Sequence, residues 1–276
     1  MKKGLTELVF IIDRSGSMSG LEDDTIGGFN AMLQEQKTVE GEAVVTTVLF
    51  SDGHELLHDR INIQAVAPLT RADYTVGGNT ALLDAIGIAI HKIRKVQRNT
   101  NEEFRAEKVL FIIITDGHEN ASRHYTADRI RKRIEHQKQK YGWEFVFFGA
   151  NMDAIAQAAD IGIAADRAQN FCADSVGTSS VYTSMSTMST AFRTGKPISF
   201  TDLTDVTQGE SEPQSAKAAL ENLKRVAGGL GKAAGELVDE AAELFRAAQA
   251  NGGKIPDVNE IVRQVLSGQN KKEGQK

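Results

Sequence analysis

Two apolar runs that each end in an aspartate constrain the fold of this chain more than any other feature. Residues 8–12 (Leu-Val-Phe-Ile-Ile) lead into Asp13, and residues 109–115 (Val-Leu-Phe-Ile-Ile-Ile-Thr) lead into Asp116. Such uninterrupted runs are typical of strands that are buried on both faces, as in parallel sheets covered by helices. Ligands of open α/β sheets bind outside the carboxyl ends of the strands. We therefore expect Asp13 and Asp116 to lie at one such edge.

The rest of the first 195 residues alternates between predicted strands and predicted helices. Further strands are expected at 43–50, 143–148 and 169–172, and helices from about residue 24 and at 82–93, 125–140, 154–159 and 175–192. Asp52-Gly53 between two strand-like runs is a strong hairpin signal, so residues 54–58 are expected to form one antiparallel edge strand. This alternation predicts an α/β fold with a doubly wound, mostly parallel sheet.

The pattern changes beyond residue 195. Residues 196–214 hold two of the four prolines together with several Thr, Asp and Glu, which is typical of a linker. In residues 220–248, leucine and alanine recur at alternating spacings of three and four. This pattern predicts a helical extension over residues 215–268 with an apolar seam, broken near Gly228 and Gly229. The seam has two possible roles. It packs within the same chain, or it binds another helix, which belongs either to a second copy of the chain or to a partner. Residues 269–276 are expected to be a disordered tail.

Composition and charge bear on which partners the protein can bind and on where in the cell it works. The net charge of −5 gives no reason to expect nucleic acid or an anionic membrane as a partner. No run approaches the ~20 apolar residues of a membrane span, and the start of the chain lacks a signal-peptide cleavage site. The single cysteine, Cys172, excludes an intrachain disulfide, and its apolar surroundings predict a buried, inert thiol. We expect a cytoplasmic protein.

Three predicted loops at strand or helix ends carry oxygen-bearing side chains. The first is Asp13-Arg14-Ser15-Gly16-Ser17, the second is Gly77-Gly78-Asn79-Thr80, and the third is Asp116-Gly117. Alternate residues of an extended loop can turn three oxygens inward, and hard oxygens are the ligands of Mg²⁺. Without an ion, the serines would satisfy the backbone of a turn, Asp116 would cap a helix, and Asn79 or Thr80 would cap the following helix.

Together these loops resemble the metal-ion-dependent adhesion site (MIDAS) of von Willebrand factor A (VWA) domains, which share a Rossmann-like fold with integrin I domains. That site combines Asp-x-Ser-x-Ser, a Thr and an Asp, which correspond here to Asp13, Ser15, Ser17, Thr80 and Asp116. The resemblance covers roughly residues 5–195. It implies that the three hydroxyls contact the metal directly, and that the two carboxylates act more often through water. A carboxylate from a partner then completes the coordination.

The resemblance implies a stand-alone, bacterial-type VWA domain that binds an Asp or Glu of a protein partner through Mg²⁺, which Mn²⁺ could replace. The alternative is a Mg²⁺-dependent phosphohydrolase with Asp13 as the nucleophile. Such phosphatases usually carry a second acid two residues later, where this chain has Ser15. A serine hydrolase with His118 as the base lacks the Gly-x-Ser-x-Gly elbow. We therefore expect a binding module that is not an enzyme.

Overall fold

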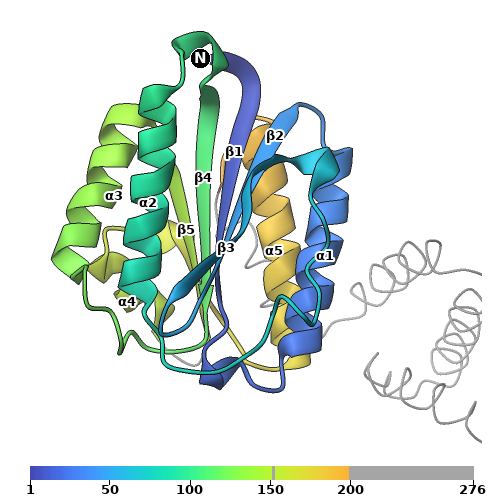
Figure 1. Cartoon of the computed structure of the whole chain (residues 1–276), viewed down its shortest axis with the longest axis vertical. Helices are drawn as coiled ribbons and strands as arrows, with labels where there is room; N and C mark the ends of the chain where they lie inside the picture. The colour runs from blue at the N-terminus through green and yellow to red at the C-terminus, as the bar shows by residue number, and fades with distance from the viewer. Residues whose placement is uncertain (151–152, 199–276) are drawn as a thin grey trace, which may run out of the picture. The chain divides into compact units, whose positions relative to one another are not determined.

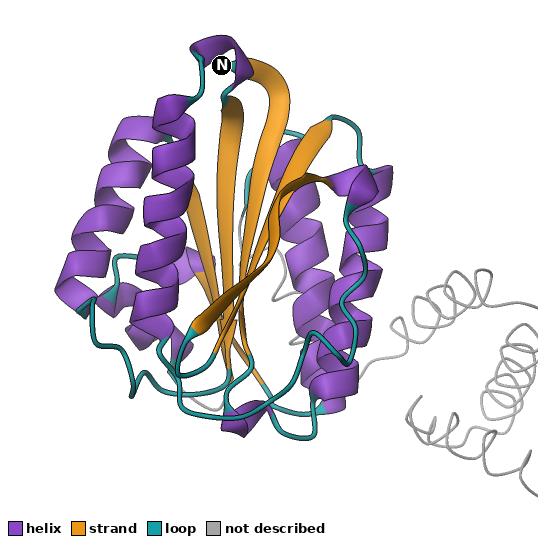
Figure 2. Cartoon of the chain, viewed as in Figure 1, coloured by secondary structure: helices purple, strands orange, loops and turns teal. Residues whose placement is uncertain are grey.

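A six-stranded sheet with helices on both faces forms the described part of the chain (Figure 1 and Figure 2). The structure, a computed structural model, describes residues 1–150 and 153–198. The strands are β1 (Lys2–Asp13), β2 (Glu42–Phe50), β3 (His54–Asn62), β4 (Ala106–Thr115), β5 (Glu144–Ala150) and β6 (Ala168–Phe171). Their order is β3-β2-β1-β4-β5-β6; β3 runs antiparallel to β2, and the other neighbouring pairs are parallel. The predicted fold class is confirmed.

Helices cover the two faces of this sheet. They are α1 (Glu22–Thr38), α2 (Leu82–Asn99), α3 (Ala127–Tyr141), α4 (Ala154–Asp160) and α5 (Ser175–Arg193). Helices α1 and α5 lie on one face, and α2 and α3 lie on the other (Figure 1). Successive strand residues point to opposite faces, so Phe10 joins the core under α1 and Ile11 joins the core under α2. Because both faces are covered, the run before Asp13 has to be apolar at every position.

Two sequence predictions about this fold need comment. The hairpin at Asp52-Gly53 is confirmed, although β3 continues to Asn62, past the predicted end at residue 58. The prediction of a buried thiol at Cys172 is wrong, since that residue is exposed. It follows β6, the strand at the edge of the sheet, where the chain leaves the core before α5 begins.

The chain stays packed on the domain to the end of the described residues. Lys108 Nζ donates to the carbonyls of Phe192 and Arg193 at 3.0 Å, which holds the end of α5 against β4. Ile198 is buried in the same core as Phe10. The rest of the predicted linker, the helical extension and the tail lie outside the described residues. Among the helices that are described, none combines the length and the apolar character needed to cross a membrane.

Candidate metal centre

Asp13 lies at the carboxyl end of β1, and its carboxylate is held from two sides. Its Oδ1 accepts a hydrogen bond from the Ser15 N–H at 2.7 Å, and its Oδ2 accepts one from Thr115 Oγ1 at 2.5 Å. The backbone carbonyl of Asp13 accepts a further bond from the Tyr74 hydroxyl. The residue is fully buried. Neighbours from the first loop and from β4 therefore fix the orientation of this carboxylate, and Tyr74 holds the backbone of the same residue.

The two serines of the first loop connect it to Asp116 in the third loop. Ser15 Oγ lies 3.1 Å from Ser17 Oγ, and Ser17 Oγ donates to Asp116 Oδ1 at 2.5 Å. Ser15 is buried, whereas Ser17 is exposed. The hydroxyls therefore form a chain that runs from the interior of the site to its surface.

Thr80 is brought to the same place by hydrogen bonds between loops. The Gly16 N–H donates to the Gly78 carbonyl at 3.0 Å, and the Gly77 N–H donates to the Arg14 carbonyl at 2.9 Å, so the first and second loops are paired. Gly78 has φ +81°, a conformation that residues with a Cβ rarely adopt. Thr80 itself is buried, and within the described residues its hydroxyl makes no hydrogen bond.

The three hydroxyls converge on Gly117. A Cβ at this glycine would lie 2.9 Å from Thr80 Oγ1, 3.1 Å from Ser17 Oγ and 3.7 Å from Ser15 Oγ. Hydroxyls from two loops thus surround a point beside the third loop. The two aspartates are joined to the same serines, because Ser17 Oγ donates to Asp116 Oδ1 and the Ser15 N–H donates to Asp13 Oδ1. The structure brings all five predicted site residues together.

The environment of the two carboxylates favours a bound cation. Burial raises the pKa of Asp13 from 3.8 to about 6, although hydrogen bonds from Thr115 and Ser15 lower it; the charge of Asp116 raises it further. Burial also raises the pKa of Asp116. Each shift means that the charged form is held unfavourably in the absence of positive charge nearby. A divalent ion would reverse this effect, because it favours both carboxylates in their charged form.

The donor set fits a hard cation. Neutral hydroxyls and carboxylates offer the oxygen ligands of Mg²⁺ and Mn²⁺. Within residues 1–150 and 153–198, no group of three or more His, Cys, Asp or Glu side chains could hold a metal. An ion at this site would therefore depend on Ser15, Ser17 and Thr80.

The residue that caps α2 differs from the sequence prediction, and two further residues, Glu119 and Asn120, support the loop that carries Thr80. Neither Asn79 nor Thr80 caps this helix, because Ala81 occupies the N-cap position and makes no side-chain bond. Instead Glu119 Oε2 accepts from the Leu83 N–H at 2.9 Å. Asn120 pairs with Thr80 in both directions: its Oδ1 accepts from the Thr80 N–H at 2.9 Å, and its own N–H donates to the Thr80 carbonyl at 3.1 Å.

These supporting residues could not be found from local patterns, with one exception. Thr115 ends an otherwise apolar run, and a lone hydroxyl at the end of a buried strand could have been noticed as a partner for a neighbouring carboxylate. Glu119, Asn120 and Tyr74 carry no such signal, because their partners lie far away in the sequence.

His118 does not form a catalytic pair with the serines. It is exposed, and its Nδ1 lies 2.6 Å from Gln157 Nε2. Within the described residues, no histidine is hydrogen-bonded to Ser15 or Ser17. A serine nucleophile needs a base within hydrogen-bond reach, so this arrangement gives no support to a serine hydrolase.

Comparison with known proteins concerns the fold alone. No family model matches the chain, and no curated protein matches it. Similar solved structures include VWA domains, the class that the sequence resemblance predicts. One is the structure of proximal thread matrix protein 1 from the mussel byssus with a zinc-occupied MIDAS motif. It is 13% identical in sequence, the match covers 68% of this chain and 46% of that chain, and the TM-score is 0.48.

Two further structures are bacterial. The von Willebrand factor type A structure from Catenulispora acidiphila is 17% identical over 67% of this chain and 42% of that chain, with TM-score 0.45. The vWF domain of the type V pili tip protein Mfa5 from Porphyromonas gingivalis is 10% identical over 65% of this chain and 94% of that chain, with TM-score 0.44. The chain thus spans less than half of the mussel and Catenulispora structures.

Proposed function

We propose that the chain is a metal-dependent protein-binding module that holds Mg²⁺ and, through it, an Asp or Glu of a partner. The observation that carries this proposal is the convergence of the Thr80, Ser17 and Ser15 hydroxyls around Gly117. Neutral ligands leave the charge of an ion less compensated than carboxylate ligands do, so an external carboxylate is attracted to it. Ser17 is exposed, which leaves the ion accessible from outside. Mn²⁺ could take the same place.

The geometry argues against a phosphohydrolase that uses Asp13 as its nucleophile. Both oxygens of this carboxylate accept hydrogen bonds, and the residue is fully buried. The place of a second acid is taken by Ser15. These observations favour a binding function over catalysis. The cytoplasmic location and self-association through the C-terminal helices stay predictions from the sequence.

Metal binding and partner binding can be separated at Thr80. Thr80→Ala removes one neutral ligand that water can replace, and it changes no charge. We expect its Mg²⁺ affinity, measured by calorimetry, to fall modestly. Its affinity for a carboxylate-bearing partner should fall about tenfold or more, which corresponds to about 1.4 kcal/mol. Thr80→Ser keeps the hydroxyl and should bind like the parent.

A partner for this test can be identified by pull-downs in Mg²⁺ and in chelator, as a protein that is captured only with the metal. A panel of short peptides that contain Asp or Glu serves as the direct probe. Binding should require Mg²⁺ or Mn²⁺ and should be lost when the acidic residue of the peptide is amidated. If Thr80→Ala bound the acidic probe as tightly as the parent, the hydroxyl would have no part in recognition. If the parent bound no Mg²⁺ or Mn²⁺, the proposal would be wrong altogether.

A further inference from the structure

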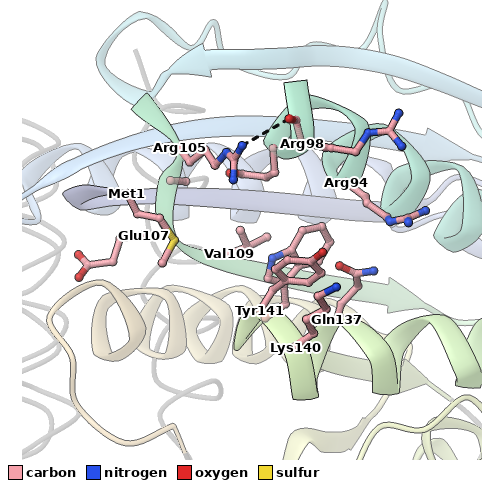
Figure 3. Close-up of a pocket in the computed structure, with 12 residues that line it drawn as sticks. Met1, Arg94, Arg98, Arg105, Glu107, Val109, Gln137, Lys140 and Tyr141 are labelled. Atoms are coloured by element: carbon pink, nitrogen blue, oxygen red, sulfur yellow. Dashed lines mark hydrogen bonds between the residues drawn. The ribbon is translucent and has the colours of Figure 1, made fainter. Parts of the chain in front are cut away.

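A pocket lies at the opposite end of the strands from the metal centre. It adjoins the amino-terminal end of β4 and lies between the carboxyl-terminal parts of α2 and α3 (Figure 3). Its volume is ≈ 370 Å³, toward the small end of the range of about 300–1,000 Å³ that is common for small-molecule sites. Asp13 and Asp116 lie at and just beyond the carboxyl ends of β1 and β4. The two sites therefore share no residue.

The walls of this pocket carry an excess of positive charge. Arg94, Arg98, Arg105 and Lys140 line it, against the single carboxylate of Glu107. That carboxylate is already engaged, because it accepts the Gly4 N–H at 2.7 Å. Within residues 1–150 and 153–198, none of these four cations forms an ion pair with a carboxylate. Arg105 donates to the carbonyls of Thr100 and Arg98, at 2.7 and 3.4 Å, and Lys140 Nζ lies 5.4 Å from the centre of the Tyr141 ring. The guanidinium groups of Arg94 and Arg98 have no hydrogen-bond partner among the described residues. Cations gathered around a concave surface favour an anionic ligand.

Aromatic rings form another part of the wall. Tyr141 is 48% exposed, and its ring centroid lies 6.4 Å from that of the buried Trp143. Phe111 stacks on Trp143 at 5.5 Å and an interplanar angle of 20°, which holds the indole in place. Figure 3 shows Tyr141 among the basic side chains. An exposed ring in this position offers a face on which a planar group can stack.

Gln137 supplies a polar group without a partner. The residue is 2% exposed and lines the pocket, and its side-chain Oε1 is buried with no hydrogen-bond partner among the described residues. A buried polar atom that lacks a partner is unfavourable, so a rotation of the side-chain amide that brings Oε1 to the pocket gains affinity for a ligand that supplies a donor. An amide presents a donor beside an acceptor, and this arrangement matches the paired groups on the edge of a nucleobase.

From these three features we propose that the pocket binds a small anion that carries a planar heterocycle, of the nucleoside monophosphate class. The phosphate is attracted by Arg94 and Arg98, the heterocycle stacks on Tyr141, and its edge pairs with the amide of Gln137. The small volume suits one nucleotide rather than a dinucleotide. This site is independent of the proposed metal centre, so either proposal can fail without the other.

The chain contains one tryptophan, Trp143, and its fluorescence reports on this pocket directly. AMP, GMP, CMP and UMP are titrated into the full chain in the presence of chelator, with excitation at a wavelength where the bases do not absorb. At least one nucleotide should change the emission saturably. It should also bind about tenfold or more tightly than inorganic phosphate or its own nucleoside alone, since only the nucleotide uses both parts of the site.

Variants test each contact. Arg98→Glu reverses one cation, and Tyr141→Ala removes the exposed ring; each should weaken the nucleotide about tenfold. Gln137→Leu should weaken the nucleotide but leave phosphate unchanged. Lys95→Glu is the matched control, because this residue is exposed on the same helix, carries the same charge change and does not line the pocket. It should bind the nucleotide like the parent.

Three results would overturn the proposal. In the first, none of the four nucleotides changes the fluorescence saturably. In the second, phosphate alone binds as tightly as the nucleotide, which would leave the rings and Gln137 without a role. In the third, Lys95→Glu weakens binding as much as Arg98→Glu does, which would show a general attraction of anions to a basic surface. Circular dichroism of each variant confirms that the fold is retained.

Discussion

Glu119, in the loop after β4, caps the amino end of α2 by accepting the Leu83 N–H at 2.9 Å. The same carboxylate accepts the N–H groups of Ala121 and Ser122 at 3.0 and 2.7 Å, so it also shapes its own loop. One side chain therefore links the loop that carries Asp116 to the helix that follows Thr80. The proposed ligands on the second and third loops are positioned as a single unit.

Glu119→Ala should disturb both stability and metal binding. Loss of a helix cap typically costs about 0.5–2 kcal/mol, and this carboxylate also holds its own loop, so we expect the free energy of unfolding to fall by about 1–2 kcal/mol. Mg²⁺ affinity should fall as well, because Thr80 and Asp116 lose their common anchor. Urea denaturation in chelator and calorimetry with Mg²⁺ measure the two effects.

The control for this prediction is Glu103→Ala, which removes an exposed acid of the same type away from both loops. It should change the free energy of unfolding by less than about 0.5 kcal/mol and leave Mg²⁺ affinity intact. A Glu119→Ala protein as stable as the Glu103→Ala protein would show that the observed cap contributes nothing.

Gly117→Ala should block the metal centre while leaving the fold intact. The added methyl group would lie 2.9 Å from Thr80 Oγ1 and 3.1 Å from Ser17 Oγ, so it occupies the space into which the hydroxyls point. We expect Mg²⁺ binding to fall about a hundredfold, or about 2.7 kcal/mol. Calorimetry measures the affinity, and a thermal melt in chelator checks the fold.

Gly77→Ala is the matched control within the second loop. A Cβ there meets nothing within 4 Å, and the backbone bond from its N–H to Arg14 is kept. This variant should bind Mg²⁺ like the parent. Equal affinity in the two alanine variants would mean that the space beside Gly117 does not hold the ion.

The sequence predicts the fold well because the strands carry strong local signals. The run before Asp13 is apolar at every position, which follows from its burial on both faces, and Asp52-Gly53 marks the one antiparallel pair. The first site loop is found from the Asp-x-Ser-x-Ser spacing, and Thr80 and Asp116 are assigned through the resemblance to VWA domains. In the strands, the hairpin and the first loop, a short stretch of sequence contains the whole signal.

Longer-range features escape such patterns. Leu83 and Glu119 are 36 residues apart, and Tyr74 lies 61 residues from the Asp13 carbonyl that it contacts. Only the folded loops bring these partners together, so the local pattern favours Thr80 or Asn79 as the cap over the distant Glu119. Cys172 was misplaced for a related reason. Apolar neighbours suggest a core position, but Cys172 lies just after β6, the strand at the edge of the sheet, and is exposed there.

The position of Ile198 sets the length of a truncated domain. This side chain is 7% exposed and packs in the core between the sheet and α1 and α5. We expect residues 1–200 to fold and to bind Mg²⁺ without the predicted helical extension. A shorter form that ends at Thr194 loses the burial of Ile198 and should be less stable by about 1.5–3 kcal/mol. Thermal melts of both forms compare them, and equal stability would show that Ile198 does not contribute.

Asp13 gives the apo protein a pH dependence whose sign follows from its raised pKa. The folded state binds the proton with a pKa of about 6, against 3.8 for the ordinary group, and burial is the main cause. This carboxyl therefore favours folding below about pH 4 and loses that contribution as the pH rises through about 6. In chelator, the stability of the parent minus that of Asp13→Asn should fall between about pH 4 and pH 7. Taking this difference removes the contributions of other titrating groups, such as Glu7 and His58.

A bound cation should reverse the pH dependence of stability that Asp13 causes, because the cation interacts with the charged form of this carboxyl. Protons and Mg²⁺ then compete for one carboxylate, and the affinity for Mg²⁺ should fall as the pH drops through about 6. Below that value each further pH unit should cost about tenfold in affinity, since one proton is released for each ion bound. Calorimetry at several pH values, in buffers of different ionisation enthalpy, measures both the affinity and the proton release. An affinity for Mg²⁺ that stayed constant from about pH 7 to about pH 5, with no proton release, would show that the ion does not interact with Asp13.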